Sequence, residues 1–234
     1  IPNPQSPIPN PQSPIKSKYN PIIKYKIKIK IYNCYKLFVN FNKYIKMPKV
    51  LFACSKGTES AEFTCPYDIL KRAGADLTIA KVKENDKDTE KFFVTAQNLR
   101  VLADNFIDEV KDNTYDMIIC PGGLPNAQIL GKNKTLIEML KKQKSAGRWY
   151  CAICASPFEV FESNGLLEGE KGTGYPGYGK FKDESKLKER VVISNKCVTS
   201  MGPCSAFEFG FTLCELLFGK DKKEELQAAM VFKA

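Results

Sequence analysis

The chain has 234 residues and a formal net charge of +10, which by itself suggests a nucleic-acid-binding protein. The charge is concentrated, however: residues 1–46 contain nine lysines and no acidic residue, so residues 47–234 hold 27 basic and 26 acidic side chains. A nearly neutral domain has no electrostatic footprint for DNA or RNA, and we expect no nucleic-acid partner. No apolar run approaches the roughly 18 residues of a membrane span, so we expect no membrane partner either.

Residues 1–46 differ in composition from the rest of the chain. A direct repeat, Ile1–Pro7 and Ile8–Pro14, precedes a stretch rich in Ile, Lys, Tyr and Asn, and the first methionine is Met47. We expect residues 1–46 to be a low-complexity leader, disordered or not native, with Met47 as the start of the domain. Two alternatives stay open: a mitochondrial presequence, although its typical arginines are absent, and a strand formed by the alternating Ile and Lys of residues 24–31.

From Met47 onward, apolar runs of strand length alternate with segments of helical spacing. The predicted strands are residues 49–54, 76–82, 92–94, 99–102, 117–120, 149–153, 171–174, 191–194 and 197–200. The predicted helices are residues 60–73, 104–111, 135–145, 156–163, 205–218 and 222–229. Such alternation is typical of a parallel sheet covered by helices on both faces. We therefore predict that residues 47–234 form a single α/β domain with a sizeable core.

Cys154 stands where one predicted strand turns into a helix. The apolar run Trp149–Ile153 ends directly before it, and the small residues Ala155 and Ser156 open the next helical pattern. A sharp strand-to-helix turn holds its turn residue at the carboxyl edge of a sheet, facing the free N–H groups of the helix. Because a helix N-terminus can lower the pKa of a thiol strongly, we expect Cys154 to be a reactive residue that is mainly thiolate.

The chain contains nine cysteines and no histidine. The lack of histidine excludes a Cys-His dyad, a Ser-His-Asp triad and any His-ligated metal site. Cys151 and Cys154 leave a redox pair or half of a zinc site open, but Cys151 should lie within the strand and no second closely spaced pair follows. We therefore expect no metal and no other cofactor. Buried free cysteines without a signal peptide indicate the cytoplasm, or the mitochondrion if residues 1–46 are a native presequence.

Three segments fall at the carboxyl edge of the predicted sheet, where open α/β proteins bind ligands. They are residues 55–62, the Pro121-Gly122-Gly123 turn, and the turn at Cys154. A Gly-Gly pair can leave a backbone N–H group free to face a ligand. That N–H group and the one of Ala155 would form an oxyanion pocket, and a carboxyl group from the first segment could contact the thiol.

Short motifs along residues 47–234 occur in one order at compatible spacing. They are Lys56-Gly57-Thr58-Glu59, Pro66-Tyr67-Asp68 with Arg72-Ala73-Gly74, Tyr115-Asp116 before Pro121-Gly122-Gly123, Ala152-Ile153-Cys154-Ala155, and Ser200-Met201-Gly202-Pro203 before Phe207-Glu208-Phe209. Together they resemble the ThiJ/PfpI (DJ-one) superfamily, most closely its Parkinsonism-associated protein deglycase branch. The resemblance implies a flavodoxin-like three-layer α/β/α sandwich with a mostly parallel sheet and a nucleophile elbow.

The resemblance also implies roles for four residues. Cys154 matches the reactive nucleophile of the family, and Glu62 matches the glutamate that hydrogen-bonds it. Gly123 and Ala155 match the backbone donors of the oxyanion pocket. Burial and like-charge repulsion raise the pKa of a glutamate beside a thiolate, so Glu62 is expected to donate a hydrogen bond or to move a proton.

Three further residues, Gly122, Tyr175 and Pro203, are expected from the resemblance to line the pocket around the nucleophile. Tyr175 takes the place where many relatives have a histidine before a proline. A phenol is a poor base at neutral pH, so proton transfer would fall to Glu62 or to a water molecule. Cys204 stands where relatives often have glycine; it is either a packed loop residue or a resolving thiol for an oxidised Cys154.

The function that the resemblance implies is that of a cysteine-dependent glyoxalase or deglycase. Its substrates would be methylglyoxal, glyoxal or early glycation adducts, handled without glutathione, and it would protect against carbonyl and oxidative stress. The alternative is a redox-sensing cysteine protein with chaperone-like activity, in which the thiol is oxidised to a sulfinic acid. An amidase or protease is opposed by the missing histidine. Relatives are commonly homodimers, and we expect a homodimer here.

Overall fold

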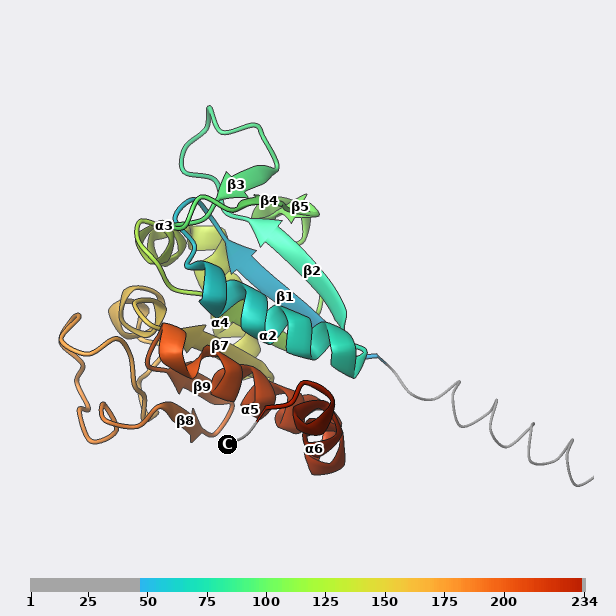
Figure 1. Cartoon of the computed structure of the whole chain (residues 1–234). Coiled ribbons are helices and arrows are strands. Elements are labelled where there is room, and N and C mark those ends of the chain that lie inside the picture. The colour runs from blue at the N-terminus through green and yellow to red at the C-terminus, as the bar shows by residue number, and fades with distance from the viewer. Residues whose placement is uncertain (1–46, 233–234) are drawn as a thin grey trace, which may run out of the picture. The chain divides into compact units, whose positions relative to one another are not determined.

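The computed structural model describes residues 47–232, and the expectations for residues 1–46 lie outside this part of the chain. Seven strands form one mostly parallel sheet with helices on both faces, which confirms the flavodoxin-like α/β architecture (Figure 1). Across the sheet they are β5 (Asn105–Phe106), β2 (Asp76–Lys81), β1 (Lys49–Cys54), β6 (Met117–Cys120), β7 (Trp149–Ile153), β9 (Cys197–Ser200) and β8 (Val191–Ser194). Within this sheet, β8 runs antiparallel to β9 at one edge.

Successive side chains of the central strands point to opposite faces of the sheet, and each set packs under different helices. The helices are α2 (Ser60–Ala73), α3 (Asn126–Lys132), α4 (Lys134–Ser145), α5 (Ala206–Phe218) and α6 (Lys220–Ala229). Val50 and Phe52 of β1 join the core under α2 and α5. Leu51 and Ala53 join the core under α3 and α4. Burial on both faces explains why these strands are continuous apolar runs in the sequence.

The strands β1, β6, β7 and β9 are parallel neighbours, so their carboxyl ends lie at the same edge of the sheet. The register places Cys120 of β6 beside Ala152 of β7, and Ile153 of β7 beside Ser200 of β9. The loops that follow these four strands therefore meet at one edge. All the candidate site residues lie on these loops, on the following first turn of α2, or on the segment that leads to Tyr175.

The predicted helix at residues 104–111 is wrong. The chain forms the two-residue strand β5 and then a 3-10 turn at Ile107–Glu109. The reason lies in Asp104, which was expected to cap the helix: its N–H donates to the carbonyl oxygen of Ile79 at 2.9 Å, and its Oδ2 accepts the N–H of Ile79 at 2.8 Å. Pairing with β2 takes the place of capping.

Other boundaries differ in ways that matter for the site. The predicted strand at residues 171–174 is irregular, and its Thr173 N–H donates to the side chain of Thr199 at 2.8 Å instead of to a strand backbone. The predicted helix at residues 156–163 is a π-turn followed by a 3-10 turn, Pro157–Phe161 and Glu162–Asn164. The predicted strands at residues 92–94 and 99–102 form a hairpin of β3 (Phe92–Val94) and β4 (Arg100–Leu102). In the described residues, no helix has the length and apolar character to cross a membrane.

Candidate active site

Cys154 occupies a sharp turn between β7 and the π-turn that follows it. Its φ is 67°, in the left-handed region, which costs a non-glycine residue about 1–3 kcal/mol. Hydrogen bonds to the neighbouring loops hold this conformation: the Cys154 N–H donates to Ser200 O at 2.9 Å, and the Tyr175 N–H donates to Cys154 O at 2.8 Å. The strained turn is therefore fixed from β9 on one side and from the Tyr175 segment on the other.

Gly122 brings the side chains of Cys154 and Glu62 together. Glu62 enters from the first turn of α2, is fully buried, and its Oε2 accepts the Gly122 N–H at 2.9 Å. A methyl group placed on Gly122 would lie 2.6 Å from Glu62 Oε2 and 2.6 Å from Cys154 Cβ. Both side chains thus pack on the bare backbone of Gly122, and any larger residue there would displace one of them.

The environment of Glu62 favours its protonated form. Burial is the main cause and raises the pKa of Glu62 to about 7, and the charge of Glu59 adds to the effect. The Cys154 thiol and the Gly122 N–H lower this pKa as hydrogen-bond donors to the carboxylate. Among the described residues, however, Glu62 Oε1 has no hydrogen-bond partner of normal geometry, so the contact with the thiol is a loose one. A carboxyl group with a neutral pKa can both accept and return a proton.

The thiol of Cys154 is not the preformed thiolate that its place on the turn suggested. Burial raises the pKa of Cys154 to about 12, the charge of Glu62 raises it further, and hydrogen bonding from the N–H groups of Gly123 and Ala155 lowers it. Only 8% of the residue is exposed, so desolvation outweighs these two donors. Burial therefore shifts the pKa of this thiol upward, opposite to the direction expected from its place at a helix N-terminus.

The two backbone N–H donors near Cys154 lie on the turns after different strands, Gly123 after β6 and Ala155 after β7. Gly123 has φ of 86°, and a methyl group on it would lie 2.2 Å from Gly57 O and 2.5 Å from Glu59 N. Only glycine satisfies both constraints, because the conformation is left-handed and the first loop packs against it directly. Ala155 follows the nucleophile, and both N–H groups stabilise negative charge at the Cys154 sulfur.

A buried polar network that the sequence did not reveal fixes the turn after β6. Asn126 Nδ2 donates to the carbonyl oxygens of Pro121 and Gly122 at 2.8 and 3.0 Å, while its Oδ1 accepts the Ser55 N–H at 2.7 Å. The Ser156 hydroxyl also donates to Pro121 O, at 2.6 Å. This network joins the loops after β1 and β6 to the segment after β7. In the sequence, the one indication of this network is a polar residue, Asn126, shortly after the Gly-Gly pair.

The remaining pocket residues occupy the outer side of the site. Tyr175 is partly exposed beside Cys154. Pro203 is exposed and begins a 3-10 turn after β9. Its neighbour Gly202, which was not among the expected pocket residues, is the residue of this loop that lies against both Tyr175 and Glu62. The structure therefore brings Gly202 to the site more closely than the sequence indicated.

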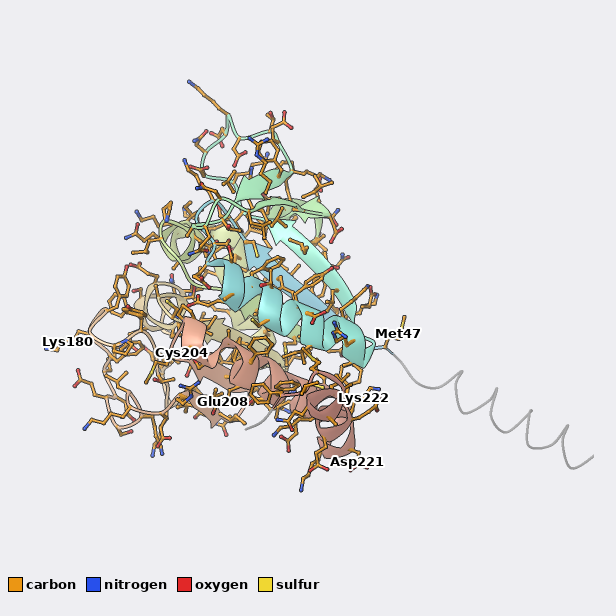
Figure 2. The ribbon with its side chains drawn as sticks, viewed as in Figure 1. Met47, Lys180, Cys204, Glu208, Asp221 and Lys222 are labelled. Carbon is orange, nitrogen blue, oxygen red and sulfur yellow. The ribbon has the colours of Figure 1, made fainter. Side chains whose placement is uncertain are left out.

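The other cysteines near the nucleophile have separate environments. Cys151 is fully buried in β7, and both it and Cys154 are free thiols. Cys204 is exposed near the start of α5, beside Glu208 (Figure 2). Arg190 donates to Cys204 O at 2.6 Å and to its sulfur at 3.7 Å, so Cys204 is a loop residue held by Arg190, but an exposed one. No group of three or more Cys, Asp or Glu side chains in residues 47–232 is arranged to hold a metal ion.

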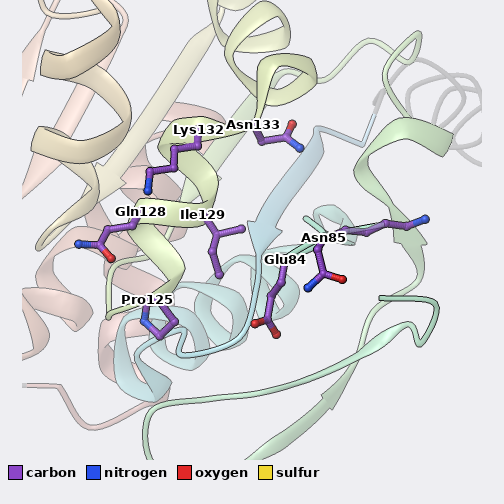
Figure 3. Close-up of a pocket in the computed structure, with 8 residues that line it drawn as sticks. Glu84, Asn85, Pro125, Gln128, Ile129, Lys132 and Asn133 are labelled. Carbon is purple, nitrogen blue, oxygen red and sulfur yellow. The ribbon is translucent and has the colours of Figure 1, made fainter. Parts of the chain in front are cut away.

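A pocket of about 460 Å³ lies close to the site but does not include the nucleophile. Figure 3 shows Glu84 and Asn85 on one side of it, and Pro125 and Ile129 at the start of α3 on the other. Its full lining is Lys83, Glu84, Asn85, Pro125, Gln128, Ile129, Lys132 and Asn133. Neither Cys154 nor Glu62 belongs to this lining, so the pocket is separate from the pair at the elbow.

A mostly parallel sheet, with a cysteine on the strand-to-helix turn of a central strand, defines a flavodoxin-like α/β protein with a nucleophile elbow. The model of the DJ-1/PfpI family matches residues 48–216, and the chain belongs to this family. Protein DJ-1 homolog B of Arabidopsis thaliana is 36% identical over 183 residues, which are 78% of this chain and 41% of the relative. The chain thus spans less than half the length of that relative.

Two other comparisons extend over most of both chains. The "Glutathione-independent glyoxalase DJR-1.2" of Caenorhabditis elegans is 32% identical over 170 residues, which are 72% of this chain and 87% of the relative. The solved structure of oxidized Toxoplasma gondii DJ-1 has 35% sequence identity and a TM-score of 0.71, and the match covers 80% of this chain and 100% of that one.

The substitution Glu62→Gln should remove a pH dependence of stability. The pKa of Glu62 is about 7 in the folded state, above its ordinary 4.5, so folding strengthens proton binding. The stability that this contributes is complete below the unfolded pKa and is lost as pH rises through about 7. Relative to Glu62→Gln, the free energy of unfolding of the native chain should fall by about 3 kcal/mol between about pH 4 and about pH 8.

Urea titrations of both proteins across this range measure the difference. Glu138→Gln, on the exposed face of α4, is the matched control, and its curve should follow that of the native chain. Parallel curves for the native chain and Glu62→Gln would contradict the raised pKa.

Proposed function

We propose that the protein is a cysteine-dependent glyoxalase or deglycase, acting without glutathione on methylglyoxal, glyoxal or early glycation adducts. The observation that carries this proposal is the pair of Cys154 and Glu62 packed on Gly122, in which burial gives the carboxyl group a pKa of about 7. A buried thiol beside a carboxyl group with a pKa near neutrality can add to an aldehyde, and the carboxyl group can then move a proton.

The first step is addition of the thiol to the aldehyde carbon. The sulfur–carbon bond forms, the carbon–oxygen double bond becomes single, and the sulfur proton passes to Glu62. Because the pKa of Cys154 is raised to about 12 by burial, the proton leaves as the bond forms and not before. The N–H groups of Gly123 and Ala155 hold the developing oxyanion. Return of the proton from Glu62 gives a neutral hemithioacetal and a free carboxylate.

The second step moves a proton between the two carbons of the substrate. Glu62 takes the proton from the carbon bonded to sulfur and returns it to the neighbouring carbon, while the hydroxyl proton on the first carbon passes to the carbonyl oxygen of the second. These two transfers turn the hemithioacetal into a 2-hydroxy thioester. One carbon is oxidised and the other reduced, so no external oxidant is needed. Water then adds to the thioester, the carbon–sulfur bond breaks, and the thiol regains its proton. Methylglyoxal gives lactate and glyoxal gives glycolate.

Similarity to the C. elegans relative, which is named a glutathione-independent glyoxalase, supports this reaction class. An early glycation adduct of the same dicarbonyl on an amine is a hemiaminal, which releases the free amine and the aldehyde reversibly. The thiol would then add to this aldehyde, so one site would serve both activities. The resulting role would be protection against carbonyl and oxidative stress. An amidase or protease fits less well, since the sequence has no histidine to protonate an amine leaving group.

Lactate release from methylglyoxal should depend on both members of the pair. Cys154→Ser should fall to background, and Glu62→Gln should lose at least about 100-fold in kcat/KM, the usual contribution of a positioned acid–base group. Cys204→Ser removes an exposed thiol outside the site and should keep native activity. An enzymatic lactate assay measures all four proteins; equal yields from the native chain and Cys154→Ser would sink the proposal.

A redox-sensing cysteine protein with chaperone-like activity is the second candidate. A solved relative, Toxoplasma gondii DJ-1, is described as oxidized, and the N–H groups near Cys154 suit a sulfinate oxygen as well as an oxyanion. The raised thiol pKa opposes this role, because the thiolate is the form that peroxide oxidises.

Mild peroxide treatment tests whether the N–H groups near Cys154, which favour its oxidation, outweigh its raised pKa, which opposes it. A sensor site should direct the gain of two oxygen atoms to Cys154 before the more exposed Cys204, whereas exposure alone should direct oxidation to Cys204 first. Peptide mass spectrometry with a peroxide titration measures the order. Oxidation of Cys204 with Cys154 unchanged would count against the sensor.

A homodimer and a cytoplasmic location complete the proposal. Phe92 and Leu102 are exposed cross-strand neighbours on the hairpin of β3 and β4, and Leu99 is exposed at the turn end of the same hairpin. These side chains supply apolar surface for a second copy. Analytical ultracentrifugation should show a dimer for the native chain and a monomer for Leu102→Lys; a native monomer would contradict this part. The cysteines of the described residues are free, as in a reducing compartment.

A further inference from the structure

Two N–H groups that face Glu62 and Cys154 belong to consecutive peptide bonds. The Gly122 N–H donates to Glu62 Oε2 at 2.9 Å, and the Gly123 N–H lowers the pKa of Cys154 by stabilising negative charge on its sulfur. In a trans peptide bond, the carbonyl group points away from the N–H group that shares its plane. Contacts to the carbonyl oxygens of Pro121 and Gly122 therefore determine where these two N–H groups point.

One side chain, that of Asn126, donates to both of these carbonyl oxygens. Its Nδ2 lies 2.8 Å from Pro121 O and 3.0 Å from Gly122 O. Its Oδ1 accepts the Ser55 N–H at 2.7 Å, and because an N–H group can only donate, this partner fixes which way the amide group is turned. The side chain is fully buried. An amide nitrogen has two donor hydrogens, so the two carbonyl oxygens take up its whole donor capacity.

Each of the two carbonyl oxygens also accepts a second hydrogen bond. The Ser156 hydroxyl donates to Pro121 O at 2.6 Å, and the Glu59 N–H donates to Gly122 O at 3.1 Å. A carbonyl oxygen has two lone pairs, so both oxygens are fully used. Hydrogen bonds to a carbonyl oxygen polarise its peptide bond and strengthen the N–H group on the other side as a donor. The two N–H groups are thus oriented and strengthened from behind.

We propose that Asn126 is a positioning residue for the reaction at Cys154; this inference rests on the proposed function. Through two consecutive peptide bonds, Asn126 directs one N–H group at the carboxyl group of Glu62 and the next at the oxyanion that forms when the thiol adds to an aldehyde. It acts through the backbone of Gly122 and Gly123 and not by contact with the substrate. Loss of its donor group therefore weakens both N–H groups even in a correctly folded chain.

Loss of the Asn126 donor should slow turnover. Asn126→Leu removes the donor without adding a charge, and the Ser55 N–H keeps the Thr58 hydroxyl as an acceptor at 3.3 Å. We expect kcat/KM for methylglyoxal to fall about tenfold, because polarisation changes each hydrogen bond by roughly 10–30% and a complete oxyanion donor contributes about 100- to 1,000-fold. The fall should appear in kcat and not in KM, since the bound substrate does not yet carry the oxyanion. An enzymatic lactate assay measures both constants.

A measurement without turnover separates this role from a purely structural one. Because a weaker Gly123 N–H raises the pKa of Cys154 further, Asn126→Leu should slow the alkylation of Cys154 by iodoacetamide at neutral pH by about threefold. Thr58→Val is the matched control: it removes a buried hydroxyl group that contacts Asn126 at its acceptor end, with Oδ1 at 3.0 Å, and it should keep the native rate. Peptide mass spectrometry measures the rates, and equal rates for all three proteins would overturn the inference.

Ser156→Ala is a milder variant that tests the first peptide bond alone. It removes one of the two donors to Pro121 O, so the Gly122 N–H becomes a weaker partner of the Glu62 carboxylate and the pKa of Glu62 should rise above about 7. In urea titrations, the fall in stability should then extend to higher pH than in the native chain, because this stability is lost as pH rises through the folded pKa. Coincident profiles would overturn the inference, even where Asn126→Leu fails to fold. Slower alkylation of Asn126→Leu, in a protein whose native chain makes no lactate, would contradict the proposed function alone.

Discussion

The packing of two side chains on the bare backbone of Gly122 is the constraint from which the properties of this site follow. With no Cβ between them, the thiol of Cys154 and the carboxyl group of Glu62 share one buried space. Burial then raises the pKa of each group, of Glu62 to about 7 and of Cys154 to about 12. The shared space thus disfavours the charged form of both groups at once, which couples the proton of the thiol to that of the carboxyl group.

The sheet topology is what makes this contact possible. The neighbouring parallel strands β1, β6, β7 and β9 end at one edge. From that edge β1 leads to Glu62, β6 to Gly122, β7 to Cys154 and β9 to Gly202. Four segments far apart in the sequence therefore converge without any long loop. Their backbones are tied by hydrogen bonds that cross between strands, such as Cys154 N–H to Ser200 O, so the strained turn is supported by the rigid part of the fold.

The sequence was sufficient for the layers of the fold and for the position of Cys154 on a strand-to-helix turn. Alternating apolar and amphipathic segments, and a cysteine placed at the end of an apolar run, are local signals. The failures were of another kind. Asp104 resembled a helix cap but pairs with Ile79, and Asn126 holds the turn after β6 by contacts to residues on two segments, after β1 and after β6. The pKa of Cys154 was mispredicted because helix N–H groups can be read from the sequence, whereas desolvation depends on everything packed around the sulfur.

The raised thiol pKa also bears on what the strain at Cys154 achieves. A left-handed residue at this turn costs about 1–3 kcal/mol, and the buried Glu62 oxygen adds a further cost. Neither is offset by making the thiol more acidic. Instead the turn places the sulfur within reach of the N–H groups of Gly123 and Ala155 and of the Glu62 carboxyl group together. The strained backbone therefore contributes position and not acidity: it brings the sulfur, two backbone N–H groups and one carboxyl group together.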